Sequence, residues 1–159
     1  TRLPMFGVPL DAWYVWIGLA IVSSAAFGVV TTLPSAAPPD AAGAARTVDG
    51  VATSEYAATG SHPLSNAETV RIGTDSISVR GAGGTDHAAL GYGPVVPAIE
   101  GSKLRMVLHG EPPSRMFASP ARFERAIRRA RLAEPRWRSA ERLTVRRVQW
   151  EGVDGVLVG

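Results

Sequence analysis

The longest apolar run of the chain lies near its amino terminus. No charged residue occurs between positions 12 and 39, and the apolar part, residues 12–33, is 22 residues long. A helix of that length spans roughly 33 Å, close to the thickness of the hydrocarbon layer of a bilayer. A secretory leader has a shorter apolar region, of about 7 to 15 residues. The pattern therefore predicts a membrane or assembly helix over residues 1–33.

Two features of this run suggest how the helix is used. Trp13, Tyr14 and Trp16 lie at its amino-terminal edge, where aromatic rings settle at the membrane interface. Ala20, Ser24 and Gly28 follow one another at i+4 spacing, which would let two helices approach closely in lipid. We therefore predict an interface belt and a helix-packing face, although small residues are frequent in this Ala-rich chain.

The next segment, residues 34–63, has little apolar periodicity. Residues 34–45 are rich in Pro and Ala, a composition that favours extended backbone. We expect a stalk and linker here, with a short helix within residues 47–58.

The pattern then changes to short β-type segments separated by Gly and Pro, over residues 64–159. The expected strands are 69–72, 76–79, 87–92, 104–109, 143–150 and 156–158, the last two joined by a turn at Asp154-Gly155. Ser119-Pro120 opens one helix that must end before Pro135. Its apolar stripe consists of Phe123, Ala126, Ile127 and Ala130. The predicted fold class is α+β: a hydrophobic, transmembrane-type amino-terminal helix followed by a small β-rich ectodomain with one helix in its carboxy-terminal half.

Residues that could support catalysis are sparse. The chain has no cysteine, which excludes thiolate metal sites and cysteine nucleophiles. Its three histidines, at 62, 87 and 109, lack the spacing of a metal motif. Asp86-His87 resembles part of a catalytic pair, but no GxSxG motif accompanies it. We expect no catalytic residue, no metal site, no cofactor and no enzymatic activity.

Charge is distributed unevenly between the two halves. Residues 1–100 contain four Arg and eight acidic residues, whereas residues 101–159 contain 13 basic and six acidic residues. Seven arginines form a cluster that is a candidate for binding an acidic partner: Arg122, Arg125, Arg128, Arg129, Arg131, Arg136 and Arg138. Phosphates of nucleic acid or anionic lipid headgroups are other candidate ligands. A solvated helix face, with Glu124 supporting Arg128, would also explain the pattern.

Three segments of the chain resemble those of a known protein family: PMFGVPLDAWYVWIGLA, PPDAAGAARTVDGVA and RRVQWEGVDGVLVG. The chain resembles a family of small haloarchaeal single-pass membrane proteins encoded near type IV pilus-like secretion components. The resemblance implies a context and transfers no catalytic residue. It departs from the acidic surfaces usual in haloarchaea, because the sequence pI is about 9.9. A basic protein suits that setting if its Arg-rich face meets an acidic partner.

Together these patterns predict a non-enzymatic, membrane-anchored, extracytoplasmic component of a type IV pilus-like apparatus. Its expected partners are membrane lipid and other subunits of the apparatus, with the ectodomain outside the cell. One alternative is a pilin-like filament subunit that self-assembles through the amino-terminal helix, in which case the protein lies within an extracellular filament. Another is an anchored domain that binds anionic lipid or nucleic acid, the latter being the less expected ligand.

Overall fold

The computed structural model describes residues 11–31 and 36–159, with side chains described for 13–23 and 36–159. The chain divides into two compact units, Thr1–Ser35 and Ala36–Gly159. In the first unit, α1 (Asp11–Thr31) forms where the long apolar run predicted a helix. The predicted ends of that run, residues 1–10 and 32–33, lie outside the described residues.

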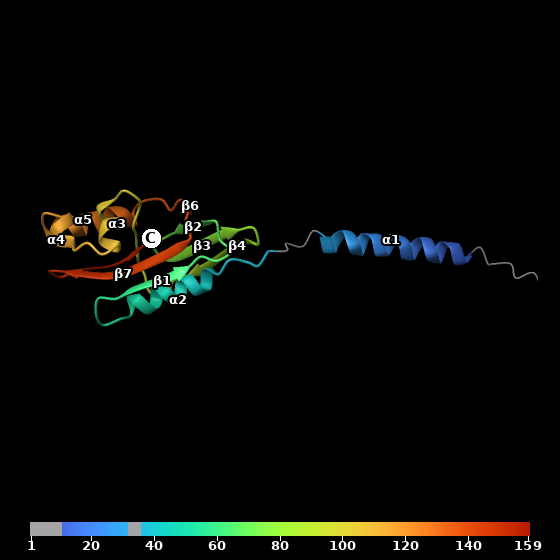
Figure 1. The fold of residues 1–159 in the computed structure, drawn as a ribbon, viewed down its shortest axis with the longest axis horizontal. Coiled ribbons are helices and arrows are strands. Elements are labelled where there is room, and N and C mark those ends of the chain that lie inside the picture. Colours follow the sequence, from blue (N-terminus) through green and yellow to red (C-terminus); the bar gives the residue numbers. More distant parts are fainter. Residues whose placement is uncertain (1–10, 32–35) are drawn as a thin grey trace, which may run out of the picture. The chain divides into compact units, whose positions relative to one another are not determined.

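The second unit, which we call the folded unit, contains two four-stranded sheets (Figure 1). Sheet A has the order β1 (Thr59–Pro63), β7 (Arg142–Trp150), β8 (Val153–Val158) and β5 (Val96–Pro97). Sheet B has the order β4 (Gly84–Ala89), β3 (Ser76–Gly81), β2 (Thr69–Ile72) and β6 (Arg138–Ser139). All neighbouring strands run antiparallel except β5 and β8, which are parallel.

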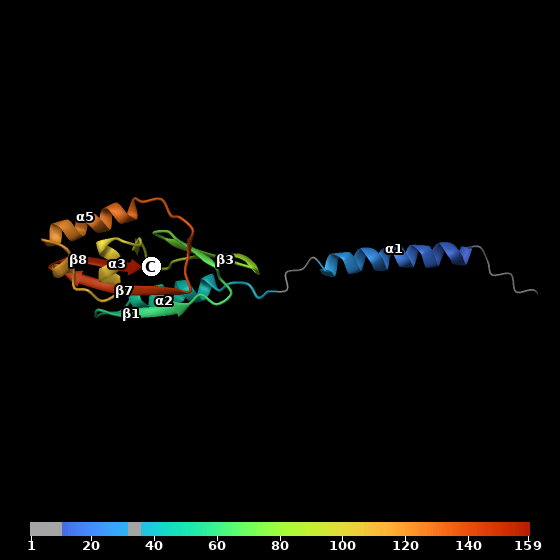
Figure 2. The same ribbon diagram turned by 45° about the horizontal axis from the view of Figure 1, so that its top comes forward.

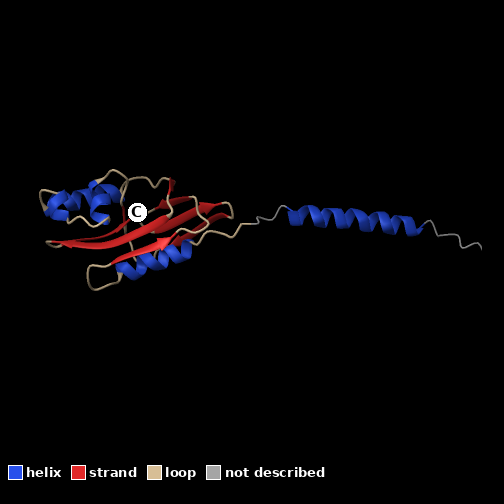
Figure 3. Cartoon of the chain, viewed as in Figure 1, coloured by secondary structure: helices blue, strands red, loops and turns tan. Residues whose placement is uncertain are grey.

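Helices cover both faces of sheet A. Figures 1 and 2 place α2 (Ala41–Ala52) on one side of β7 and α5 (Pro120–Arg131) on the other. The short helices α3 (Lys103–Leu108) and α4 (Pro113–Met116) precede α5 in the chain. Helices thus flank the strands in the folded unit (Figure 3), which confirms the α+β class.

Two hydrophobic clusters form the core, one on each face of sheet A. The first joins α2 with sheet B, and the second joins α3 and α5. Residues of β8 alternate between them, because successive side chains of a strand point to opposite faces: Val156 and Val158 belong to the first cluster and Leu157 to the second.

The prediction of a stalk over residues 34–63 is wrong from residue 41 onward. Ala41, Ala44 and Val48 of α2 are completely buried, at helical spacing. The Asp40 side chain caps the helix by accepting a hydrogen bond from the Gly43 N–H, 2.7 Å away. An Ala-rich helix has a weak hydrophobic signal, but its small side chains let it pack closely against the strands. The short helix expected within 47–58 is part of α2, which begins earlier.

The strand predicted over residues 104–109 is also wrong, because these residues form α3. Ser102 caps this helix, with its hydroxyl accepting a hydrogen bond from the Arg105 N–H. Leu104, Val107 and Leu108 are buried at i, i+3 and i+4, which is helical rather than strand spacing. The predicted strand over 87–92 begins earlier and ends at Ala89 as β4.

The final hairpin was predicted with the wrong turn. In the β7–β8 register, Trp150 pairs with Val153, so the turn consists of Glu151 and Gly152, both with positive φ. Gly155 instead lies within β8, where an added Cβ would be 3.0 Å from the Ile127 side chain of α5. This glycine permits close approach of helix and sheet. The predicted strands 69–72 and 76–79, and the helix opened by Ser119-Pro120, are confirmed.

Candidate binding surfaces

The described part of α1 presents an apolar surface. Trp13, Tyr14 and Trp16 are 66–75% exposed, and Ala20 is also exposed. Ser24 and Gly28, the other members of the predicted packing face, lie outside the range for which side chains are described. Within the described part of the chain, no helix is long and apolar enough to cross a membrane.

The seven clustered arginines do not act as one surface. Arg128 pairs with Glu124 at 2.8 Å on the exposed side of α5, as the i,i+4 spacing suggested. Arg131 donates to the Pro94 carbonyl oxygen, 2.8 Å away, and so ties α5 to the loop before β5. These two have structural partners and line none of the three pockets described below. The other five line surface pockets: Arg122, Arg125, Arg129, Arg136 and Arg138.

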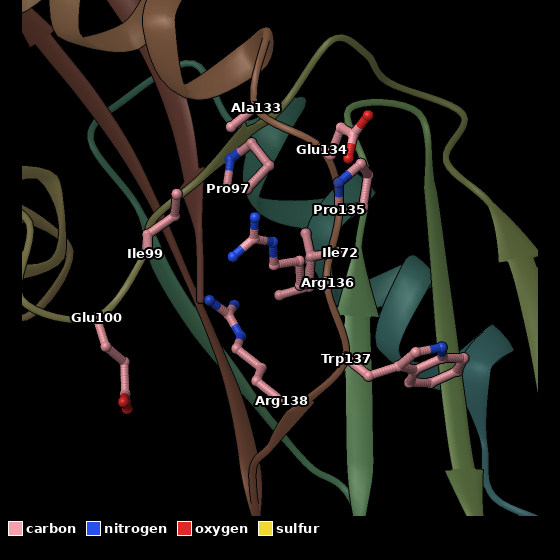
Figure 4. Close-up of a pocket in the computed structure, with 10 residues that line it drawn as sticks. All are labelled: Ile72, Pro97, Ile99, Glu100, Ala133, Glu134, Pro135, Arg136, Trp137 and Arg138. Carbon is pink, nitrogen blue, oxygen red and sulfur yellow. The ribbon is translucent and has the colours of Figure 1, made fainter.

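The largest of these pockets has a volume of about 740 Å³ and lies between β6 and the segment that follows β5. Arg136 and Arg138 point to one side of the segment 136–138 and Trp137 to the other (Figure 4). Figure 4 shows both guanidinium groups directed toward the segment that carries Pro97 and Ile99, with the carboxylate of Glu134 turned away. The pocket therefore combines two cationic groups with apolar walls.

Arg138 carries a positive charge in an unfavourable position. It donates one hydrogen bond to the Ala98 carbonyl oxygen, at 3.2 Å. Its Nη2 atom is buried and, like Nη1 of Arg105, has no hydrogen-bond partner in the described part of the chain. Burial lowers the pKa of the Arg138 guanidinium; the nearby charge of Arg105 lowers it further, and Glu100 opposes both effects. The positive charge at this end of the pocket is therefore only partly compensated.

On the opposite side of the same segment, Trp137 packs against sheet B. The guanidinium carbons of Arg80 and Arg71 lie 4.3 and 5.1 Å from its ring centroid. Both are within cation–π distance, so the Trp137 ring already interacts with two cations. The sequence offered no signal for this contact, because Trp137 is far in the chain from the β2–β3 hairpin that carries both arginines.

The histidine and acid residues considered for catalysis have structural neighbours. His87 Nδ1 lies 3.0 Å from the Ser78 hydroxyl on sheet B. Asp86 accepts hydrogen bonds from the N–H groups of Ala41 and His87, so its carboxylate is engaged with the main chain. His62 lies 3.7 Å from Asp40 near the start of α2. In the described residues, no three His, Cys, Asp or Glu side chains gather in a way that could hold a metal ion.

Sequence reasoning missed several residues that line the pockets. Lys103, Ile99 and Pro97 lie beside the Arg cluster only because α3 and the segment before it fold against α5. A strand had been expected where α3 forms, so no pattern pointed to this juxtaposition.

A family of unknown function, DUF7283, matches residues 7–148, a range that includes α1 and most of the folded unit. No curated protein and no solved structure matches the chain.

Proposed function

The chain belongs to DUF7283, a family of unknown function, and we propose that it is a non-enzymatic, membrane-anchored component of a type IV pilus-like surface apparatus, with its folded unit outside the cell. The observation that carries the proposal is the apolar surface of α1. Contiguous exposed apolar surface marks a site that contacts lipid or another protein.

The composition and exposure of α1 support this role. From Trp13 to Val22, eight large apolar side chains are each more than half exposed. Burying such side chains stabilises by about 25 cal/mol per Å² of apolar surface removed from water. The helix therefore gains much free energy from a lipid or protein environment, and Trp13, Tyr14 and Trp16 suit the headgroup level of a bilayer.

The folded unit has a core of its own, and the residues considered for catalysis make structural contacts. Both core clusters are built from residues between Ala41 and Val158, so the unit has a hydrophobic core of its own. Asp86 and His87, the pair considered for catalysis, interact with the main chain and with Ser78, which favours a structural role. The link to a pilus-like apparatus comes from the sequence resemblance described above.

Fractionation of cells that express the full chain tests the anchoring. We expect the full chain to remain with membranes during an alkaline carbonate wash and to be released by detergent, whereas residues 36–159 alone should be soluble. Leu19→Arg should reduce membrane retention, because a cation near the centre of a bilayer costs about 2.5–3.5 kcal/mol. Leu19→Val is the matched control and should be retained. Release of the full chain as a monomer during the carbonate wash would contradict the proposal.

The main competitor is a pilin-like subunit whose α1 packs against other copies of itself. In that case shearing the cells should release polymers of the full chain, without detergent. Protease added to intact cells reports the orientation: digestion of the folded unit with retention of α1 supports an extracellular ectodomain, and complete protection contradicts it.

A further inference from the structure

Three adjoining pockets lie along α5 and the segment that follows it, and we call them together the groove. Its middle part, of about 440 Å³, shares Pro97, Ile99 and Ala133 with the 740 Å³ pocket beside β6. At its other end it shares Phe117 and Arg129, among others, with a third pocket of about 410 Å³. The three pockets are therefore neighbours, because each shares lining residues with the next.

The groove has an apolar floor. Leu104 of α3 and Ala130 of α5 are buried beneath its middle part. Ile99 is 51% exposed although its side chain is aliphatic, and it lines both the middle part and the larger pocket. Apolar surface of this kind gains free energy when a ligand covers it.

The walls of the groove are cationic. Six basic side chains and two carboxylates, those of Glu100 and Glu134, line its three parts. The basic side chains are Lys103, Arg122, Arg125, Arg129, Arg136 and Arg138. The ion pairs of the folded unit use other cations, so among the described residues none of the six is within ion-pairing distance of a carboxylate.

These properties disfavour nucleic acid. Single-stranded nucleic acid binds by stacking its bases on aromatic side chains. The groove is lined by two aromatic residues, and both already face cations: Trp137 faces Arg71 and Arg80, and Phe117 faces Lys103 at 5.8 Å. A flat membrane surface would contact exposed cations but not the recessed apolar floor.

An extended polypeptide matches the groove better. Successive side chains of an extended chain point to opposite sides, so apolar residues can cover the floor while acidic residues reach the walls. We propose that the groove along α5 binds an extended acidic segment of a partner protein, with apolar side chains on Ile99 and Leu104 and carboxylates beside the arginines. This inference goes beyond the anchored role, because the groove lies entirely within the folded unit.

Fluorescence polarisation with the full chain in a nonionic detergent tests the inference. The probe is a fluorescein-labelled peptide of about ten residues, roughly 33 Å when extended. Glu occupies every second position of the peptide, and the remaining positions are alternately Leu and Ser. Matched peptides replace every Glu by Gln or every Leu by Ser. We expect the original peptide to bind more tightly than either, with an affinity that falls as salt is added.

Variants of the chain locate the binding. Arg125→Gln combined with Arg129→Gln should raise the Kd about tenfold, because two cations of the groove wall are lost. Arg128→Gln removes an arginine from the same helix that is paired with Glu124 and lies outside the groove lining. It should leave the Kd within about twofold of the wild type. Ile99→Ser should weaken binding of the Leu-containing peptide and leave binding of the Ser-substituted peptide unchanged.

Several results would overturn the inference. One is equal binding of the Glu and Gln peptides. Another is a loss of affinity in Arg128→Gln that equals the loss in the variant of Arg125 and Arg129. An oligothymidine of about twelve nucleotides that binds more tightly than the peptide would assign the groove to nucleic acid instead. Vesicles of anionic lipid that compete with the peptide, while neutral vesicles do not, would assign it to a membrane surface.

Discussion

The placement of α2 in the core is open to a direct test by substitution of Val48. This side chain is completely buried, in the cluster that joins α2 with both sheets. Val48→Ala removes two methyl groups, each worth about 0.8 kcal/mol when buried. The cavity left behind is on the order of 50 Å³ and adds about 1.2 kcal/mol if the surroundings do not relax. We expect the free energy of unfolding to fall by about 1.6 to 2.8 kcal/mol.

Gly50 provides a matched control on the same helix. It is exposed, and a Cβ added to it would meet nothing within 4 Å. Gly50→Ala should raise the free energy of unfolding by about 0.5–1 kcal/mol, because Ala loses less backbone entropy than Gly in a helix. The two substitutions therefore have opposite expected signs.

Urea unfolding of residues 36–159, followed by circular dichroism, measures both effects. The midpoint should fall for Val48→Ala and rise for Gly50→Ala, with unchanged dependence on urea concentration. For a unit of this size we expect the Tm of Val48→Ala to fall by about 8 °C. Midpoints equal to that of the wild type for both variants would show that residues 41–52 are a stalk and that the packing argument is wrong.

Two further predictions concern the folded unit. Arg147 donates hydrogen bonds to the carbonyl oxygens of Ala52, the last residue of α2, and of Ser54. Arg147→Met should therefore lower the free energy of unfolding by about 1 to 2 kcal/mol, whereas substitution of the exposed Arg142 by Met should change it by less than about 0.5 kcal/mol. Similar urea midpoints for both variants would contradict the capping role. Gly152 has a φ of 84° in the β7–β8 turn. Gly152→Ala should therefore lower the free energy of unfolding by about 1 kcal/mol in the same assay, despite the open space around this residue. An unchanged midpoint would contradict the turn assignment.

The candidate groove was only partly predictable. The seven arginines were visible as a cluster in the sequence, but their division into two groups was not. Arg128 has its partner four residues away, so its role could be inferred from helical spacing. Arg131 is tied to Pro94, 37 residues distant, and Arg138 to Ala98, 40 residues distant. Contacts of that kind depend on which segments the fold brings together.

The apolar floor was not predictable at all. Ile99 and Lys103 belong to a segment whose local pattern suggested a strand nearby, and they meet α5 because α3 packs beneath it in the second cluster.

Local interactions explain what the sequence alone determined: the helix of the long apolar run, the β2–β3 hairpin, and α5 with its serine cap and proline start. Each is specified by residues within a few positions of one another. The tertiary structure decided the rest. Ala-rich α2 is a core helix only because both sheets bury it, and Gly155 is a packing position because Ile127 of α5 lies against it. Weak local preferences such as these are overridden by the free energy of burying apolar surface against distant segments, which no local pattern encodes.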